Sequence, residues 1–193
     1  MNDLSARTPF PGAIAVHAPA KVNLLLAVTG LRPDGFHNLV SLVAPLSFGD
    51  TLWLAPTNLD HFSCSDPNLD TGPTNLVSKA LSIYRSATGY DQPVRVHLQK
   101  RIPIGSGFGG GSSDAVALLK GINGLNPQPL DPSGLTRVSS EIGSDCPLFF
   151  GTGPVWMEGR GEFIDPVKPS LSLAIRGQGI LIFHPGFEVS TVW

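Results

Sequence analysis

One stretch of the chain carries glycines closely enough spaced to build a ligand site. Residues 103–114 read Pro-Ile-Gly-Ser-Gly-Phe-Gly-Gly-Gly-Ser-Ser-Asp, with five glycines in the seven positions from Gly105 to Gly111. Such a run costs backbone entropy, but it lets the main chain approach a ligand and direct successive N–H groups toward it. Ser112 and Ser113 stand where a helix is expected to begin, so free amides and the positive end of the helix dipole face the loop. The stretch therefore predicts a phosphate site rather than a flexible hairpin.

The glycine pattern alone leaves several phosphate loops to consider. Gly105, Gly107 and Gly110 satisfy G-x-G-x-x-G, yet Asp131, at the spacing of the acidic partner, lies in a loop before a helix and not at a strand end. No lysine follows the glycines as in a Walker A loop, and the H-R-D and D-F-G motifs of protein kinases are missing from this sequence. A dinucleotide oxidoreductase stays as an alternative, which nicotinamide-dependent turnover would reveal.

Three ordered segments resemble one known superfamily. Pro103–Ala115 resembles the second motif of the galactokinase, homoserine kinase, mevalonate kinase and phosphomevalonate kinase (GHMP) superfamily. Pro19–Leu24, followed by Arg-Pro-Asp-Gly-Phe-His at 32–37, resembles the N-terminal signature of the branch that phosphorylates 4-diphosphocytidyl-2-C-methyl-D-erythritol. Gly-Ser-Asp-Cys-Pro-Leu-Phe at 143–149 resembles the catalytic-aspartate segment of that branch. The resemblance runs from about residue 14 to the end of the chain.

The resemblance implies an activity and a nucleotide site. It implies an ATP-dependent kinase that phosphorylates the 2-hydroxyl of 4-diphosphocytidyl-2-C-methyl-D-erythritol in non-mevalonate isoprenoid (terpenoid) biosynthesis. Magnesium would arrive with ATP, held by phosphate oxygens, waters and Ser112 or Ser113. The five histidines show no ligand spacing, so no structural metal site is expected. The implied ATP-binding residues are Pro103, Ile104, Gly105, Ser106, Gly107, Phe108, Gly109, Gly110, Gly111, Ser112 and Ser113.

The resemblance also implies roles for individual side chains. Asp145 would orient the substrate hydroxyl and accept its proton, and Lys21 would lie beside Asp145 and keep that carboxylate ionised. Asn23 would contact the substrate, Phe36 would stack on its cytosine, and His37 would hydrogen-bond to the base. The sequence departs from the family at Phe36, where a tyrosine is usual, and at Phe108, which replaces a leucine.

The family's members are longer than this chain, and the resemblance therefore implies a domain division. Residues 1–163 would form the N-terminal ATP-binding domain, and residues 164–193 would be the start of a C-terminal domain that is otherwise truncated. Apolar residues beyond Asp165, such as Leu173 and Leu181, would ordinarily pack against that second domain. Two alternatives stay open: another small-molecule kinase of the superfamily, and a non-catalytic nucleotide-binding relative. Whether the 193 residues catalyse the reaction by themselves is also left open.

Composition and charge limit the other function classes. With 13 Lys+Arg and a net charge of -2 in 193 residues, the chain offers no extended basic face, so nucleic acid is not expected as a partner. Two cysteines, in neither a zinc nor a CxxC spacing, predict no disulfide framework and a cytoplasmic protein. The N-terminal residues lack a signal-peptide pattern, and no apolar run is long enough to span a bilayer, so no membrane partner is expected.

The hydrophobic pattern predicts the elements that position the glycine loop. Asn75 or Thr74 caps a helix that ends at Gly89, a second helix follows the loop, and Asp131-Pro132 starts a third that ends before Gly143. The order of elements favours an α+β class with a mixed sheet, and the resemblance implies a ribosomal-protein-like β-α-β fold. The expected strands are 14–17 and 22–28 around a bend at 18–21, 39–43 paired with 51–54 through a connection at 48–50, and 94–98, 154–157 and 180–183.

Overall fold

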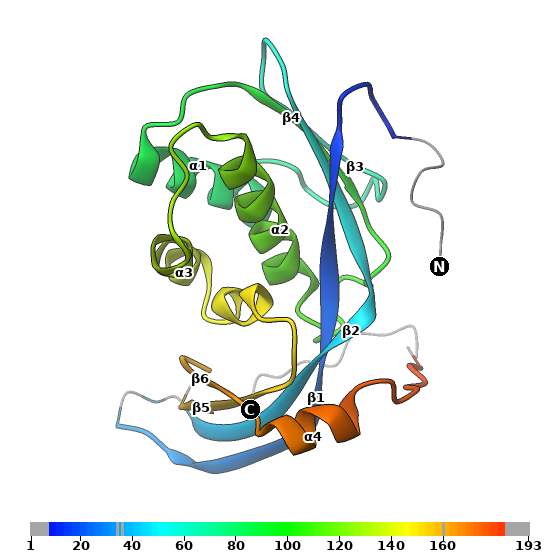
Figure 1. Cartoon of the computed structure of the whole chain (residues 1–193), viewed down its shortest axis with the longest axis vertical. Coiled ribbons are helices and arrows are strands. Elements are labelled where there is room, and N and C mark those ends of the chain that lie inside the picture. The colour runs from blue at the N-terminus through cyan, green and yellow to red at the C-terminus, as the bar shows by residue number, and fades with distance from the viewer. Residues whose placement is uncertain (1–7, 34, 36, 160, 184–193) are drawn as a thin grey trace.

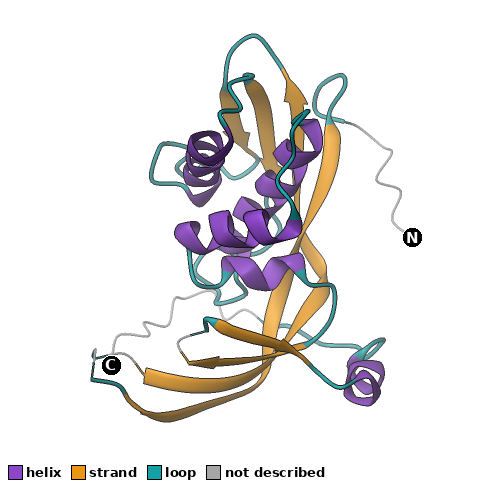
Figure 2. Ribbon diagram, turned by 60° about the vertical axis from the view of Figure 1, so that its left-hand side comes forward, coloured by secondary structure: helices purple, strands orange, loops and turns teal. Residues whose placement is uncertain are grey.

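A mixed six-stranded sheet with helices on one face forms the body of the protein (Figures 1 and 2). The computed structural model describes residues 8–33, 35, 37–159 and 161–183. The strand order is β3-β4-β2-β5-β6, with β1 also paired to β2, and only the β3–β4 pair is parallel. The elements are β1 Ile14–Leu31, β2 His37–Pro56, β3 His61–Cys64, α1 Leu76–Thr88, β4 Val94–Gln99, α2 Gly110–Leu125, α3 Pro132–Ile142, the 3-10 helix η1 Cys146–Phe150, β5 Val155–Gly159, β6 Phe163–Pro166 and α4 Pro169–Ile175. The predicted α+β class with a mixed sheet is confirmed.

The main core lies between the sheet and α1, α2, α3 and η1. The inner face of α2 is completely buried at Leu118, Leu119 and Ile122, the spacing expected of an apolar helix face. Gly121 allows α2 to approach β2 closely, because a Cβ atom there would lie 2.5 Å from Cδ2 of Leu54. The fourth helix, α4, lies apart from the others at the far end of the sheet (Figures 1 and 2). The core thus gathers beneath the helix that follows the glycine loop.

The residues that the sequence predicts to begin and end the helices are confirmed in these positions. Asn75 accepts a hydrogen bond from the backbone N–H of Val77 and caps α1, which ends at Gly89 with a φ of 72°. Asp131 accepts from the N–H of Gly134 and caps α3. Along β4, buried and less buried residues alternate, as the sequence predicts.

The prediction of four short strands at the start of the chain is wrong, because β1 and β2 each run unbroken. Pro19 fits into β1 because β1 is paired on one side only, and the pairing register shifts between Pro19 and Lys21. Gly49 and Asp50 continue β2 instead of turning; Gly49 packs so tightly against Ala18 that no side chain would fit there. Two neighbouring long strands therefore replace the expected pairs.

The C-terminal expectations also need correction. The predicted strand 180–183 is absent: residues 180–183 belong to no helix or strand. Across the described residues, the structure also has four short elements that the hydrophobic pattern did not indicate, namely β3, η1, β6 and α4. They contain four to seven residues each, too few for a periodic pattern to stand out.

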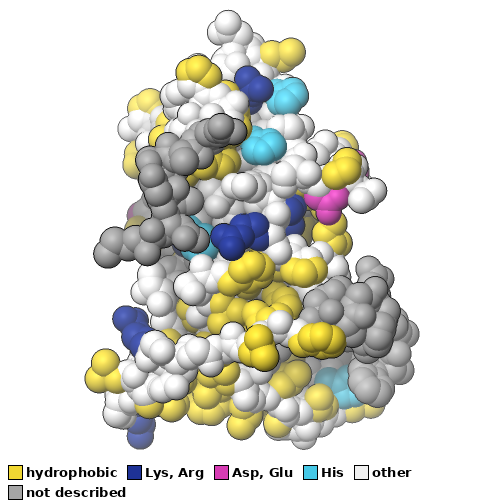
Figure 3. Space-filling model, turned by 90° about the vertical axis from the view of Figure 1, so that its right-hand side faces the viewer, with side chains coloured by type: hydrophobic (Ala, Val, Ile, Leu, Met, Phe, Trp, Pro, Cys, Tyr) yellow, Lys and Arg dark blue, Asp and Glu magenta, His cyan; other side chains and the backbone are white. Residues whose placement is uncertain are grey.

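One half of the long strands is much more exposed than the other. We call residues 24–31 of β1 together with residues 37–43 of β2 the outer arm. Leu26, Val28 and Leu31 in this arm are more than half exposed, as are Leu173 of α4 and Leu181 beyond it. Figure 3 shows hydrophobic side chains gathered over the lower half of the molecule, where the outer arm and α4 lie. The predicted exposure of apolar residues beyond Asp165 is thus seen at Leu173 and Leu181.

Candidate functional site

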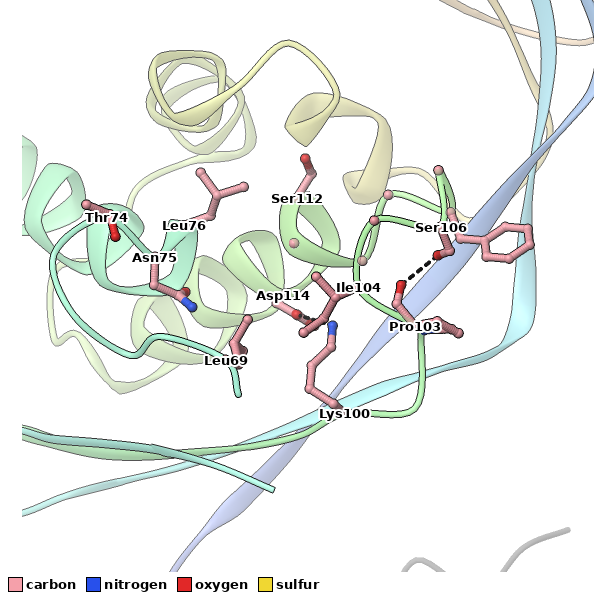
Figure 4. A pocket seen from close by; sticks show the side chains of 16 residues that line it. Leu69, Thr74, Asn75, Leu76, Lys100, Pro103, Ile104, Ser106, Ser112 and Asp114 are labelled. Carbon is pink, nitrogen blue, oxygen red and sulfur yellow. Dashed lines mark hydrogen bonds and ion pairs between the residues drawn. The ribbon is translucent and has the colours of Figure 1, made fainter. Parts of the chain in front are cut away.

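The glycine-rich loop and the start of α2 border a pocket of about 410 Å³. Gly105, Gly107 and Gly109 all have φ values between 71° and 76°, the left-handed region that side chains disfavour. Gly109 stands at the N-cap of α2 and has no side chain to cap it, so the first amide groups of the helix are left for a ligand. The lining residues are Leu69, Thr74, Asn75, Leu76, Lys100, Pro103, Ile104, Gly105, Ser106, Gly107, Phe108, Gly109, Gly110, Gly111, Ser112 and Asp114 (Figure 4).

Nearly all of the predicted phosphate-binding residues line this pocket. The run from Pro103 to Ser112 is included without a gap. Ser113 does not line the pocket, because its side chain is only 1% exposed and faces the core. Its hydroxyl is one of the buried polar atoms without a partner in the described part of the chain. Of the two serines at the start of α2, only Ser112 therefore lines the pocket.

The loop packs directly onto β1 and η1. The backbone N–H of Lys21 donates to the carbonyl oxygen of Phe108 at 2.9 Å. A Cβ atom at Gly109 would lie 2.8 Å from Cζ of Phe149 and 3.1 Å from Cγ of Lys21. Lys21 and the segment that begins at Asp145 thus approach the glycine loop from two different elements.

Asp145 immediately precedes η1, and its side chain does not cap that helix. The alternative role, in which the carboxylate serves only to cap the next turn, therefore has no support in the geometry. The turn between β5 and β6 lies close by, since a Cβ atom at Gly161 would be 3.7 Å from Oδ1 of Asp145. Gly161 has a φ of 110°, so a side chain there would be strained as well as crowded against this carboxylate.

Lys21 is buried and bonded to a neighbour on its own strand. Its ammonium group lies 3.4 Å from Oδ1 of Asn23, which also accepts from the hydroxyl of Ser41 at 3.3 Å. Among the described residues, no ion pair joins Lys21 to Asp145. The Lys21 side chain lies along Gly109 and its ammonium group contacts Asn23, so the expected pairing with Asp145 stays a prediction. Asn23, which interrupts an apolar strand, has the hydrogen-bond partners that its position requires.

Of the predicted substrate residues, neither Asn23 nor His37 lines this pocket. Phe36 lies outside the described residues. His37 is exposed at the start of β2, where it pairs with Leu31, ten residues along β1 from Lys21. The long strands curve between these two positions (Figure 2). The structure thus places Lys21 against the glycine loop, with Asn23 bonded to Lys21, and leaves His37 at the tip of the outer arm.

The sequence analysis missed a buried charge cluster beneath the loop. The ammonium group of Lys100 lies 2.5 Å from Oδ2 of Asp50 and 2.8 Å from Oδ2 of Asp114. Asp50 is fully buried and also accepts the backbone N–H groups of Arg101 and Ile102, the latter at 2.8 Å. Asp114 belongs to the glycine motif itself, immediately after the two serines, but its position alone gave no sign of these partners.

Burial changes the ionisation of this cluster. Burial raises the pKa of Asp114 to about 7, against the lowering effect of Lys100, and Asp50 adds to the increase. Burial lowers the pKa of Lys100, but Asp114 and Asp50 outweigh it, so the net pKa lies above its usual value. The ammonium therefore stays charged, whereas Asp114 titrates near neutral pH.

The two cysteines are free thiols without the features of a nucleophile. Burial raises the pKa of Cys146 to about 11, although a hydrogen bond with Ser112 opposes the shift. Burial also raises the pKa of Cys64. Because the thiolate is the reactive form, neither cysteine is suited to covalent catalysis near pH 7.

The described residues contain neither a cluster of metal-binding side chains nor a membrane-spanning helix. No group of three or more His, Cys, Asp or Glu side chains in this part of the chain is arranged to hold a metal ion. None of the helices there has both the length and the apolar character needed to span a membrane.

Comparisons with known proteins agree with this geometry. Residues 75–153, which contain the glycine loop and Asp145, match the family described as GHMP kinases N terminal domain. The chain is 41% identical over 179 residues to a 4-diphosphocytidyl-2-C-methyl-D-erythritol kinase of Protochlamydia amoebophila, covering 93% of this chain and 60% of the relative. It is 38% identical over 175 residues to the chloroplastic enzyme of that name in Arabidopsis thaliana, covering 89% of this chain and 45% of the relative.

A solved structure supports the same assignment. The crystal structure of a 4-(cytidine 5'-diphospho)-2C-methyl-D-erythritol kinase superimposes with a TM-score of 0.70 at 38% identity, covering 80% of this chain and 55% of that one. The chain thus spans 45% to 60% of the length of these relatives. The shared part includes the loop, the segment of Asp145 and the strand of Lys21.

Proposed function

We propose that the chain belongs to the GHMP kinase family and transfers the γ-phosphoryl group of ATP to the 2-hydroxyl of 4-diphosphocytidyl-2-C-methyl-D-erythritol, a step of non-mevalonate isoprenoid biosynthesis. One observation carries the proposal: the glycine loop opens its helix-start amides onto a pocket, and both Lys21 and Phe149 of η1, the helix that Asp145 precedes, pack against that loop at Gly109. Phosphoryl transfer needs mainly this combination of positioning and charge stabilisation. The likeness to relatives of this activity supports the choice of substrate.

In this proposal, residues 103–112 bind the ATP phosphates. The free amides at the start of α2 and the helix dipole favour negative charge at the loop. Ser112 is a pocket-lining hydroxyl and fits as one oxygen ligand of Mg²⁺, whereas buried Ser113 does not. When bound with the nucleotide, Mg²⁺ would neutralise charge on the phosphate oxygens. The role of Ser113 is to begin the buried face of α2.

In the same proposal, Asp145 and Lys21 act on the hydroxyl group that accepts the phosphoryl group. Asp145, which caps nothing, is free to accept a hydrogen bond from the substrate hydroxyl and then its proton. Lys21 lies against Gly109 and supplies positive charge between the loop and the acceptor. Asn23, held by Ser41, would orient the substrate. Phe36 and His37 are proposed to recognise the cytosine, and His37 lies at the tip of the outer arm.

Domain division and compartment are parts of the same proposal. The boundary expected after residue 163 falls at the start of β6, which pairs with β5. We therefore place the end of the nucleotide-binding domain after Val167, which is buried, and assign α4 and the residues beyond it to the start of a second domain. The free thiols of Cys64 and Cys146 support a reducing compartment such as the cytoplasm.

Product formation tests the proposal directly. The chain is incubated with ATP, Mg²⁺ and either 4-diphosphocytidyl-2-C-methyl-D-erythritol or the acceptor without the cytidyl group, and phosphorylated product is measured by mass spectrometry. We expect product only from the cytidyl compound. Equal transfer to both acceptors would indicate another kinase of the superfamily, and nucleotide binding without any transfer would indicate a non-catalytic relative.

Asp145→Asn provides the residue-level test. Loss of the proton acceptor should lower kcat by roughly 10²- to 10⁴-fold while leaving the affinity for ADP unchanged. Glu141→Gln is the matched control, because it removes an exposed carboxylate four residues away. An Asp145→Asn variant with the kcat of the unmodified chain would show that this carboxylate is not the base.

A further inference from the structure

A second pocket, of about 360 Å³, lies where β1, β2, α2 and the end of η1 meet. The strands border it at Pro19 and at residues 45–47, α2 borders it at Lys120, and the chain at the end of η1 borders it at Phe149 and residues 151–152. None of its lining residues belongs to the pocket at the glycine loop. Its volume lies at the lower end of the range found for small-molecule sites.

The second pocket lies away from the groups assigned to the acceptor. Those groups follow β1 from Lys21 to Asn23 and continue to His37, which pairs with the end of β1 at the tip of the outer arm. The second pocket instead borders β1 at His17 and Pro19, on the other side of Lys21 along the strand. It is therefore part of neither the proposed nucleotide site nor the proposed acceptor site.

Lys120 brings a positive charge without a counter-charge to the second pocket. It lies on α2 between Leu119 and Gly121, which are both buried. Its ammonium group donates to the carbonyl oxygen of Phe149 at 2.6 Å and lies 5.5 Å from the centre of the Phe150 ring. Among the described residues, no carboxylate forms an ion pair with Lys120, and burial lowers the pKa of its amine. Because a partly buried charge without a partner is unfavourable, an anion in the pocket would stabilise it.

The second pocket combines several hydrogen-bond donors with no acidic side chain. An ammonium group has three N–H donors, and the carbonyl oxygen of Phe149 takes one of those of Lys120. The hydroxyl groups of Ser47 and Thr152 border the same cavity, and neither is bonded to another described residue. Donors from α2, from β2 and from the segment after η1 thus surround one space from three sides.

We propose that the second pocket binds a small phosphate monoester, with the phosphate group at Lys120 and the organic part against the apolar wall. The inference does not depend on the proposed function. A phosphate group presents three strong acceptor oxygens, which suit donors from three sides better than the planar oxygen pair of a carboxylate does. Pro19, Pro45, Leu46 and Phe149 form the apolar wall, against which a compact organic group can lie.

The alternative role of Lys120 is to hold the end of η1. The bond to the carbonyl oxygen of Phe149 fits that role, because cations are favourable near the carbonyl groups at a helix end. The role uses one N–H donor, however, and it does not involve the hydroxyl groups of Ser47 and Thr152. Variants of Lys120 and of Thr152 therefore distinguish a binding site from a structural contact.

An NMR titration with phenyl phosphate locates the site. Phenyl phosphate carries a phosphate monoester on a compact apolar ring, and benzoate is a carboxylate on the same ring. We expect phenyl phosphate at millimolar concentrations to shift the backbone amide signals of Leu46, Ser47, Gly151 and Thr152, and benzoate to bind there much more weakly. Absence of shifts at these amides, shifts confined to residues 105–112 of the glycine loop, or equal binding of benzoate in the second pocket would each overturn the proposal.

Lys120→Met removes the charge and keeps the apolar stem of the side chain. The affinity for phenyl phosphate, measured from the same amide signals, should fall by roughly 10- to 100-fold, because a hydrogen bond between charged groups is lost. Lys168→Met is the matched control, since it removes an exposed lysine at the start of α4 and should leave the affinity unchanged.

Thr152→Val tests the site independently of the contact between Lys120 and η1. It removes an exposed hydroxyl group and should weaken phenyl phosphate binding by several-fold. If Lys120→Met does not fold, Thr152→Val decides by itself. An unchanged affinity in either folded variant overturns the proposal, and a loss in both that is absent from Lys168→Met supports it.

Discussion

The strands β1 and β2 pass through two regions with opposite surroundings. Near the glycine loop, Ala18 and Ala20 of β1 and Leu52 of β2 are completely buried beneath α2 and η1. In the outer arm, β1 instead carries Val28, 64% exposed, and Leu31, 70% exposed, although Ser41 and Val43 of β2 stay buried there. Strand pairing continues through both regions, so hydrogen bonding does not distinguish them. The difference lies in the helices, which in the described chain cover only the loop region.

The helices that cover the loop region explain why the proposed chemistry is placed at that end of the strands and not in the outer arm. There, the loop is held by a backbone bond to Lys21, by packing against Phe149, and by the charge cluster around Lys100. These contacts come from different elements and fix the loop without a ligand, which lowers the entropic cost of binding. In the outer arm, exposed His37 has no comparable set of buried neighbours. We therefore expect mutations at the two ends to differ strongly in effect.

Removing the carboxylate of Asp50 should have the largest effect. Asp50→Ala leaves Lys100 with one partner and two backbone N–H groups without an acceptor, and loss of one partner from a buried charge pair costs about 3–5 kcal/mol. The free energy of unfolding is measured by urea denaturation. Asp60→Ala is the control, because its pair with Arg85 is partly exposed and should cost only about 1 kcal/mol. Equal losses in the two variants would contradict the assigned role of the buried cluster.

Gly109→Ala should have the next largest effect. An alanine there adopts a positive φ and places its Cβ against Phe149 and Lys21, so we expect a loss of about 2–4 kcal/mol. Gly107→Ala is a matched control with a φ of 76° and no atom within 4 Å of the added Cβ, and it should cost only about 1–2 kcal/mol. If the two variants are equally stable, the packing of the loop on Lys21 and Phe149 is not as described.

The smallest effect is expected in the outer arm. Leu26→Ala removes a side chain that is 55% exposed, and the change in the free energy of unfolding should stay within about 0.5 kcal/mol. Leu54→Ala in the buried part of β2 should cost about 2–5 kcal/mol by the same measurement. A comparable loss for Leu26→Ala would mean that the outer arm is covered in solution, which would remove the contrast between the two regions.

Much of the fold could be predicted from local signals in the sequence. The caps at Asn75 and Asp131, the glycine at position 89 and the apolar face of α2 correctly located three helices, because each signal acts within a few residues. The two long strands were missed because Pro19 and the Gly49-Asp50 pair are typical of turns. Only tertiary packing, with Gly49 against Ala18, shows why the chain stays extended there.

Only one part of the candidate site, the glycine loop, could be predicted from the sequence. The glycine loop stands out because its residues are consecutive, and the structure places Pro103 to Ser112 around one pocket. The charge cluster could not be predicted, because its members are 14 and 50 residues apart and each occurs in an ordinary local context. The fold alone brings Asp50, Lys100 and Asp114 together.

The most direct test of this account follows the backbone amide signals of the chain by NMR as ADP is added. The account predicts that the amides of residues 105–112, at the glycine loop and the start of α2, shift most strongly. The amides of residues 24–31, in the outer arm, should keep their positions. Shifts centred on the outer arm, or binding of ADP that leaves the amides of the loop unchanged, would contradict the central claim that nucleotide phosphates bind at the glycine loop.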